Sequence, residues 1–156
     1  MSIKVIEKDE LKVVGIPWTG TFSEAQSIPN LFRKMEDRIE EVSCLTSEPV
    51  VIAPFHSRET ELTYYVTKPV GEIENVPDGM VGFSIPRKNY VCTTHKGSLN
   101  EVANTYRQLI TWMKEYGYEQ DYQALGLEIF KEEYKHQNRS GDLYFEICLP
   151  VKTYKL

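Results

Sequence analysis

The sequence has few cysteines and no paired cysteine motif. Cys44, Cys92 and Cys148 are odd in number and widely spaced, and no C-x-x-C pair occurs. Disulfide scaffolds and zinc modules rely on paired cysteines at short spacing. The scarcity therefore argues against both classes and predicts reduced cysteines that serve as buried hydrophobic side chains.

Long apolar runs are also missing. No stretch approaches the roughly 20 residues that a membrane-spanning helix needs, and the opening segment 1–4 is followed by no apolar run. We expect neither a membrane span nor a signal peptide, and a cytoplasmic location. Strand-like sequence from near Ile3 onward leaves no helix-turn-helix module. The net charge of −5 likewise disfavours direct binding to nucleic acid.

Signature motifs of common enzyme classes are absent. The chain has no G-x-S-x-G elbow, P-loop, G-x-G-x-x-G or H-E-x-x-H motif. His56, His95 and His136 lack the spacing of metal ligands. We expect no cofactor and no metal, and favour a binding protein over an enzyme.

The chain contains an internal repeat. An extended segment followed by Gly, a hydroxyl residue, an apolar residue and Glu occurs at 13–24 and again at 90–101. A second matching pair, at 61–70 and 142–151, follows in the same order. We therefore expect a single domain over residues 1–156, with one repeat at about 1–76 and the other at about 80–156.

Each half shows one amphipathic helix and alternating strands. Apolar residues recur at steps of three and four along 28–42 and 102–113, as on one face of a helix. Apolar and polar residues alternate along 62–67 and 143–149, as in strands. We predict an α+β fold of duplicated strand-helix-strand-strand units. Together they form an antiparallel sheet with two helices on one face and a ligand pocket between the halves.

One face of this sheet is predicted to be aromatic and acidic. The purely apolar strand faces belong under the helices, which leaves Tyr65, Tyr144 and Glu146 on the other face. We place Glu128 and Phe130 with them. Such a face suits an organic cation, because the two charges lose water together and each ring adds about 0.5–2 kcal/mol of cation–π attraction. An exposed strand glutamate and ordinary cross-strand packing remain alternatives.

Three further residues are candidates for the pocket wall. Trp112 lies beside the apolar stripe of the second helix, so a core role and a pocket role are both open. Trp18 and His95 occupy equivalent places in the two halves, just before the turn glycines. Paired positions at the seam could line a pocket, but a strand-end aromatic residue and a surface histidine explain them almost as well.

An ordered set of features in the second half resembles the GyrI-like small-molecule-binding superfamily, which includes effector domains of AraC- and MerR-type regulators and stand-alone proteins. The resemblance covers nearly the whole chain, and the order of its features is more specific than any one of them. The features are the segment 90–97 ending in His95-Lys96-Gly97, then Glu101, Tyr106, Trp112, Gly117-Tyr118, Glu128 with Phe130, Glu133-Tyr134, and the closing segment 147–151.

The resemblance implies a pocket between the two halves in which a buried glutamate receives lipophilic cations among aromatic rings. Glu128 stands at the matching position. The family usually has Tyr two residues later, where this chain has Phe130, so the ring is kept and a hydroxyl is lost. We expect the pKa of Glu128 to be raised, because burial disfavours its charge.

We therefore expect a stand-alone, multidrug-type binding protein of the bacterial cytoplasm that senses or sequesters amphipathic, cationic compounds. One alternative is a hydrolase of strained or electrophilic small molecules, with Glu128 as general base. Another is a gyrase-inhibitor-like protein interaction through an outer surface. The expected partner is a small organic ligand. A separate DNA-binding regulator, gyrase and a second copy of the chain remain open as protein partners.

Overall fold

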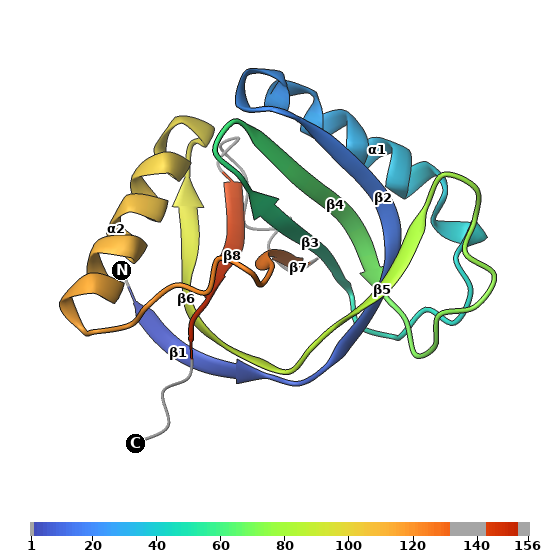
Figure 1. Ribbon diagram of the computed structural model, residues 1–156. Helices are drawn as coiled ribbons and strands as arrows, with labels where there is room; N and C mark the ends of the chain where they lie inside the picture. The colour runs from blue at the N-terminus through green and yellow to red at the C-terminus, as the bar shows by residue number, and fades with distance from the viewer. Residues whose placement is uncertain (1, 132–142, 153–156) are drawn as a thin grey trace.

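The computed structural model describes residues 2–131 and 143–152. Its elements run twice through the same order of two strands, one helix and two strands (Figure 1). The first half contains β1 (Ile3–Lys8), β2 (Leu11–Thr21), α1 (Ile28–Asp37), β3 (Val50–Ser57) and β4 (Glu61–Pro69). The second contains β5 (Val81–Ile85), β6 (Lys88–Gly97), α2 (Val102–Glu115), β7 (Gly126–Lys131) and β8 (Leu143–Pro150).

All eight strands form one antiparallel sheet in the order β1-β6-β8-β7-β3-β4-β2-β5. The sheet curls into a half-barrel, and both helices pack on its outer face (Figure 1). The predicted α+β class, antiparallel sheet and placement of the helices are confirmed. Each half carries one strand more than the sequence indicated, β1 in the first and β5 in the second.

The two extra strands are exchanged between the halves. β1 pairs with β6 of the second half, with Ile3 opposite Thr93. β5 pairs with β2 of the first half, with Leu11 opposite Ile85. The ladder between β3 and β7 then joins the halves at the centre of the sheet. Each half therefore takes the edge strand of its part of the sheet from the other half.

A hydrogen-bonded cap precedes the first helix. The Glu24 carboxylate accepts from the backbone N–H and the hydroxyl of Thr21, both at 2.9 Å, at the start of a 3₁₀ turn, η1 (Phe22–Ser27). α1 itself ends at Asp37, earlier than the apolar stripe to residue 42 predicted. The chain continues as the 3₁₀ turn η2 (Ile39–Glu41), and Val42 remains in the same core.

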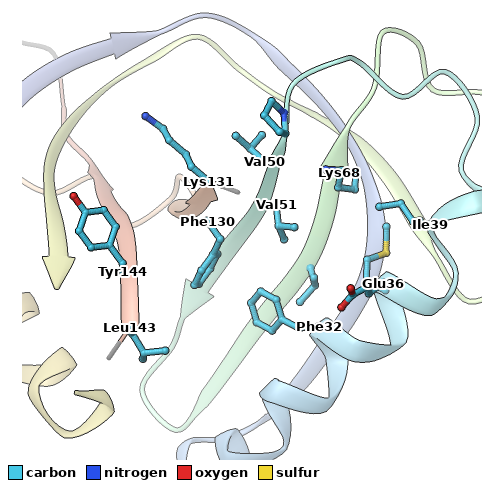
Figure 2. Close-up of a pocket in the computed structure, with 13 residues that line it drawn as sticks. Phe32, Glu36, Ile39, Val50, Val51, Lys68, Phe130, Lys131, Leu143 and Tyr144 are labelled. Atoms are coloured by element: carbon cyan, nitrogen blue, oxygen red, sulfur yellow. The ribbon is translucent and has the colours of Figure 1, made fainter. Parts of the chain in front are cut away.

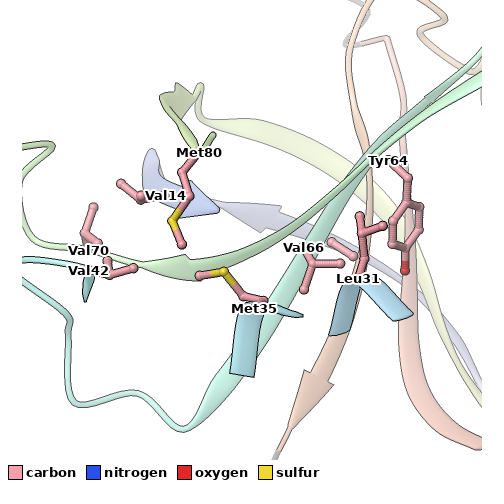
Figure 3. Packing of buried hydrophobic residues seen from close by; sticks show 9 residues of the cluster. Val14, Leu31, Met35, Val42, Tyr64, Val66, Val70 and Met80 are labelled. Carbon is pink, nitrogen blue, oxygen red and sulfur yellow. The ribbon is translucent and has the colours of Figure 1, made fainter. Parts of the chain in front are cut away.

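The sheet has an apolar core on each face. On the outer face, Leu31 and Met35 of α1 pack on the first half (Figure 3), and Leu109 and Met113 of α2 pack on the second. The inner face of the curl has its own cluster, formed by Val13, Ile52, Ile85, Tyr90, Cys92, Leu127, Ile129 and Cys148. In the described residues, no helix is long and apolar enough to cross a membrane.

Candidate functional site

Glu128 lies on β7, near the centre of the sheet. Its neighbours in the ladders are Ala53 of β3 and Ile147 of β8. The ladder register places Glu128 on the outer face, beneath the helices. A carboxylate at this position stands where the first and second halves meet.

Two tyrosine hydroxyls donate to the Glu128 carboxylate. Tyr64 of β4 donates to Oε1 at 2.7 Å. Tyr106 of α2 donates to Oε2 in a short hydrogen bond. The donors come from different halves, so the carboxylate joins a strand of the first half to the helix of the second.

Burial controls the protonation of this cluster. It raises the pKa of Glu128, and the hydrogen bonds from Tyr106 and Tyr64, with the nearby His95 ring, oppose the rise without cancelling it. Burial, and then the charge of Glu128, raises the pKa of both tyrosines well above 10. Both hydroxyls therefore keep their protons and act as neutral donors, so they do not neutralise the carboxylate.

Aromatic rings surround the carboxylate. Phe130, two residues further along the same face of β7, stacks on Phe145 at a centroid distance of 4.8 Å. It also meets Phe32 of α1 edge-on at 5.0 Å. Phe32 lies 6.3 Å from the Tyr64 ring, and Phe55 lies 6.2 Å from the Tyr106 ring. The rings around Glu128 thus come from both halves and from both layers.

A cavity of about 390 Å³ opens beside these rings, lined by residues of α1, β3, β4, β7 and β8 (Figure 2). This volume is in the range of small-molecule sites. Glu128 does not line the cavity, but its neighbour Phe130 does. The wall consists of Phe32, Met35, Glu36, Ile39, Pro49, Val50, Val51, Val66, Lys68, Phe130, Lys131, Leu143 and Tyr144.

The predicted grouping of Glu128 and Phe130 with the opposite face is wrong. Glu128 bonds to Tyr64, on the helix-covered face, whereas Tyr65 points the other way and packs on Phe83 at 5.0 Å. The error has a simple origin. Side chains alternate with a period of two, so a shift of one residue in the register of β7 exchanges its faces.

Two other candidates, Glu146 and Tyr144, lie in different surroundings. Glu146 lies on the inner face, where it pairs with Lys8 at 3.3 Å. Tyr144 lines the cavity, and the Lys96 ammonium stands 5.8 Å from its ring centroid. Of the predicted aromatic and acidic set, only Phe130 and Tyr144 reach the cavity wall.

Of the two residues before the turn glycines, Trp18 is partly buried and His95 is buried. Trp18 joins the core under α1 and lies opposite Tyr64 in the β2–β4 ladder. His95 is only 2% exposed. Its Nε2 lies 3.1 Å from the Ser98 carbonyl, which accepts, and its Nδ1 lies 2.7 Å from the Thr105 hydroxyl. The alternative of a surface histidine is wrong. The Nδ1 contact with Thr105 ties β6 to α2, and the Nε2 contact is made to Ser98, in the turn that follows β6.

Trp112 is not brought to Glu128. It stacks on Tyr116 at 4.5 Å and on Tyr118 at 5.6 Å, at the C-terminal end of α2. There it lines a separate shallow hollow. Glu133 and Tyr134 lie outside the described residues.

The sequence reasoning missed Tyr64 and Tyr106 as site residues. Both were assigned to apolar stripes, in a strand and in a helix. A tyrosine on a stripe that faces a core is itself a signal, since a buried hydroxyl needs a hydrogen-bond partner. Two such hydroxyls in different halves indicate a shared acceptor between them.

Within the described residues, one group of side chains has donor atoms close enough to hold a metal ion. It consists of Cys92, Glu146 and Cys148, on the inner face. The Glu128 cluster is not part of it, so its chemistry is that of a buried carboxylate among rings.

Comparisons with known proteins bear on the family and the fold. A family profile described as "GyrI-like small molecule binding domain" matches residues 1–152. The transcriptional regulator BrlR of Pseudomonas aeruginosa is 26% identical over 111 residues, which are 70% of this chain and 40% of BrlR. The chain thus corresponds to less than half of that curated relative.

Solved structures share the fold at low identity. The EcmrR C-terminal domain has a TM-score of 0.78 at 19% identity and covers 98% of each chain. SAV2435 bound to tetraphenylphosphonium has a TM-score of 0.73 at 14% identity, covering 97% of this chain and 94% of that one. A hydrolase from Listeria innocua has a TM-score of 0.60 at 12% identity, covering 96% and 91%.

Proposed function

This chain belongs to the GyrI-like family of small-molecule-binding domains, and we propose that its ligands are amphipathic organic cations. The cation lies among the rings of the outer face, between the halves. Glu128 supplies the opposite charge, and the apolar part of the ligand fills the cavity beside Phe130 and Phe32.

The observation that carries the proposal is the unbalanced charge of Glu128. Its carboxylate is bonded to two neutral hydroxyls, and no Lys or Arg pairs with it among the described residues. A buried charge without a counter-ion is costly, whereas a buried pair with good geometry recovers much of that cost. An organic cation would supply the missing charge and lose its own water in an aromatic setting.

The surroundings suit such a ligand more than a small inorganic ion. Tyr64, which bonds to the carboxylate, lies near the Phe32 ring, and Phe32 meets Phe130 edge-on. Cation–π contacts contribute about 0.5–2 kcal/mol each. SAV2435, which has the same fold, is seen with tetraphenylphosphonium, a lipophilic cation. In the proposal, the ring of Phe130 turns to connect the cavity with Glu128.

A thermal-shift titration with tetraphenylphosphonium tests the proposal. Wild type should be stabilised by about 2.7 kcal/mol at a hundredfold excess over the dissociation constant. Glu128→Gln keeps the shape and removes the charge, so it should lose this response. The neutral analogue triphenylphosphine oxide should stabilise both proteins weakly and equally.

Glu59→Gln is the matched control, because Glu59 is an exposed carboxylate that does not line the cavity. It should respond to the cation like wild type. Equal stabilisation of wild type and Glu128→Gln would overturn the proposal, as would the absence of any response.

A second candidate function is hydrolysis of an electrophilic small molecule. The observation in its favour is the raised pKa of Glu128 beside a cavity, which suits a general base. Its test is the time-dependent loss of a cyclopropane-bearing electrophile, followed by chromatography. Turnover that Glu128→Gln abolishes without unfolding the protein would support it, and no turnover by wild type would rule it out.

A further inference from the structure

The inner face of the sheet holds a cluster of polar side chains inside an otherwise apolar core. Cys92 of β6 and Cys148 of β8 are direct partners in the ladder, with their Sγ atoms 2.8 Å apart. Oε1 of Glu146 lies 3.2 Å from the Cys148 Sγ. The Lys8 ammonium lies 3.3 Å from the same carboxylate.

We propose that Cys92, Cys148 and Glu146 bind a thiophilic divalent cation of the Zn²⁺ and Cd²⁺ class. Their donor atoms all lie within 4.8 Å of one another. Two thiolates and a carboxylate are ligands that such cations accept, with water in a fourth position. The sequence predicted no metal, because Cys92 and Cys148 are far apart in the chain and only the β6–β8 register makes them neighbours.

The charges of the occupied site would balance. On binding, both thiols release their protons to solvent, so two thiolates and one carboxylate face the divalent cation. The excess negative charge is offset by Lys8, which already contacts Glu146. A neutral assembly is the form that an apolar interior tolerates best.

Access and geometry need only small adjustments. The side chains of Glu146 and Lys8 keep 16% and 28% of their surface exposed, so the cluster is open on that side. In a tetrahedral zinc site with bonds of about 2.3 Å, the sulfurs lie about 3.8 Å apart. The two thiols must therefore separate by about 1 Å, which a modest rotation about each Cα–Cβ bond provides.

This site is independent of the proposed cation pocket. Cys148 and Glu146 point to the inner face of β8, whereas Ile147 between them points to the outer face with Glu128. A failure of the Glu128 proposal would leave the metal proposal untouched, and the reverse also holds.

The test is a titration of the reduced full chain with Cd²⁺, followed by the ultraviolet charge-transfer absorption of cadmium thiolates. Wild type should bind one ion and gain thermal stability. Cys92→Ser and Cys148→Ser should lose the band. Glu146→Gln, which keeps both thiols but removes the third ligand, should bind at least about tenfold more weakly, since losing even an outer-shell partner of a metal site costs about 10- to 100-fold.

Cys44→Ser is the matched control, because Cys44 is the exposed third cysteine. It should bind Cd²⁺ and gain stability like wild type, so this comparison holds even if the buried serine variants fail to fold. A band that depends on Cys44 would overturn the proposal. So would the absence of a band in protein whose three thiols are shown to be free, or a Cys92–Cys148 disulfide that persists in reductant.

Discussion

Tyr64 and Tyr106 donate hydrogen bonds to opposite oxygens of the same carboxylate, that of Glu128, although one lies on a strand of the first half and the other on the helix of the second. The three side chains form a polar bridge across the seam between the halves. A ligand that pairs with Glu128 must enter beside this bridge or displace one of its arms, so binding and the contact between the halves are coupled.

Removing either arm of the bridge should destabilise the protein. Tyr64→Phe and Tyr106→Phe each delete a hydrogen bond to a buried charged group, which costs about 1.5–3 kcal/mol. The free energy of unfolding, measured with urea at neutral pH, should fall by that amount in each variant. Tyr65→Phe is the control, because Tyr65 lies on the opposite face against Phe83. Equal losses in all three variants would show that the bridge has no special role.

The stability of the free protein should depend on pH through Glu128. Burial raises its folded pKa above the ordinary 4.5, so the folded state holds a proton that the unfolded chain releases. This contribution to stability is complete below about pH 4.5 and is lost as the pH rises through the folded value. Wild type should therefore lose stability relative to Glu128→Gln over that interval. A constant difference between the two unfolding free energies would contradict the shift.

Binding of tetraphenylphosphonium should depend on pH in the opposite sense. The cation pairs with ionised Glu128, so affinity should rise as the pH increases through the raised pKa and then level off. In Tyr106→Phe, where a donor that lowers this pKa is missing, the rise should occur at higher pH. Isothermal titration calorimetry at several pH values measures both effects. If the affinity of wild type does not change with pH, a group other than Glu128 supplies the charge that binds the cation.

Phe130 should contribute to affinity for aromatic cations. Its ring lies between Phe32 and Phe145 and lines the cavity. Phe130→Leu keeps the apolar volume approximately and removes the ring, so the binding free energy should weaken by about 0.5–2 kcal/mol. Phe22→Leu provides the comparison, since Phe22 is 50% exposed on η1. An unchanged dissociation constant in Phe130→Leu would place the ligand elsewhere.

Gly15 should tolerate no side chain. A Cβ at this position would stand 2.0 Å from the carbonyl oxygen of Val66, in the neighbouring strand β4. Gly15→Ala should therefore force the β2–β4 ladder apart and cost about 1–3 kcal/mol of stability or more. At Gly71 the nearest atom is 3.9 Å from such a Cβ, so Gly71→Ala should be close to neutral. The free energies of unfolding of both variants, measured with denaturant, test this difference.

Periodicity was enough to predict both helices and several of the strands, but not the way in which the elements face one another. The alternation along β4 and β8 and the apolar stripes of both helices follow from residue order alone, and the structure confirms them. The face of Glu128 depends on the pairing of β7 with β3, and these two strands lie far apart in the chain. No local pattern records that register, so Glu128 was given the wrong neighbours.

Strand β1 was missed as a separate element for a related reason. It is a short edge strand whose partner β6 belongs to the other half, and its own sequence carries charges among its apolar residues. The cluster of Cys92, Cys148 and Glu146 was equally hidden. Two cysteines so far apart in sequence give no spacing signal, and only the ladder between β6 and β8 makes them partners.

The exchange of β1 has a consequence during synthesis on the ribosome. β1 is made before β6, which follows about 80 residues later, and this interval takes about 4–16 seconds at roughly 5–20 residues per second. For that time its backbone edge has no native partner, and a nascent chain nearby could pair with it. Lys4, Glu7 and Lys8 place charges along this short segment, and charges on an unpaired strand oppose such association. The charged residues of β1 thus protect the nascent chain from association before the fold has formed.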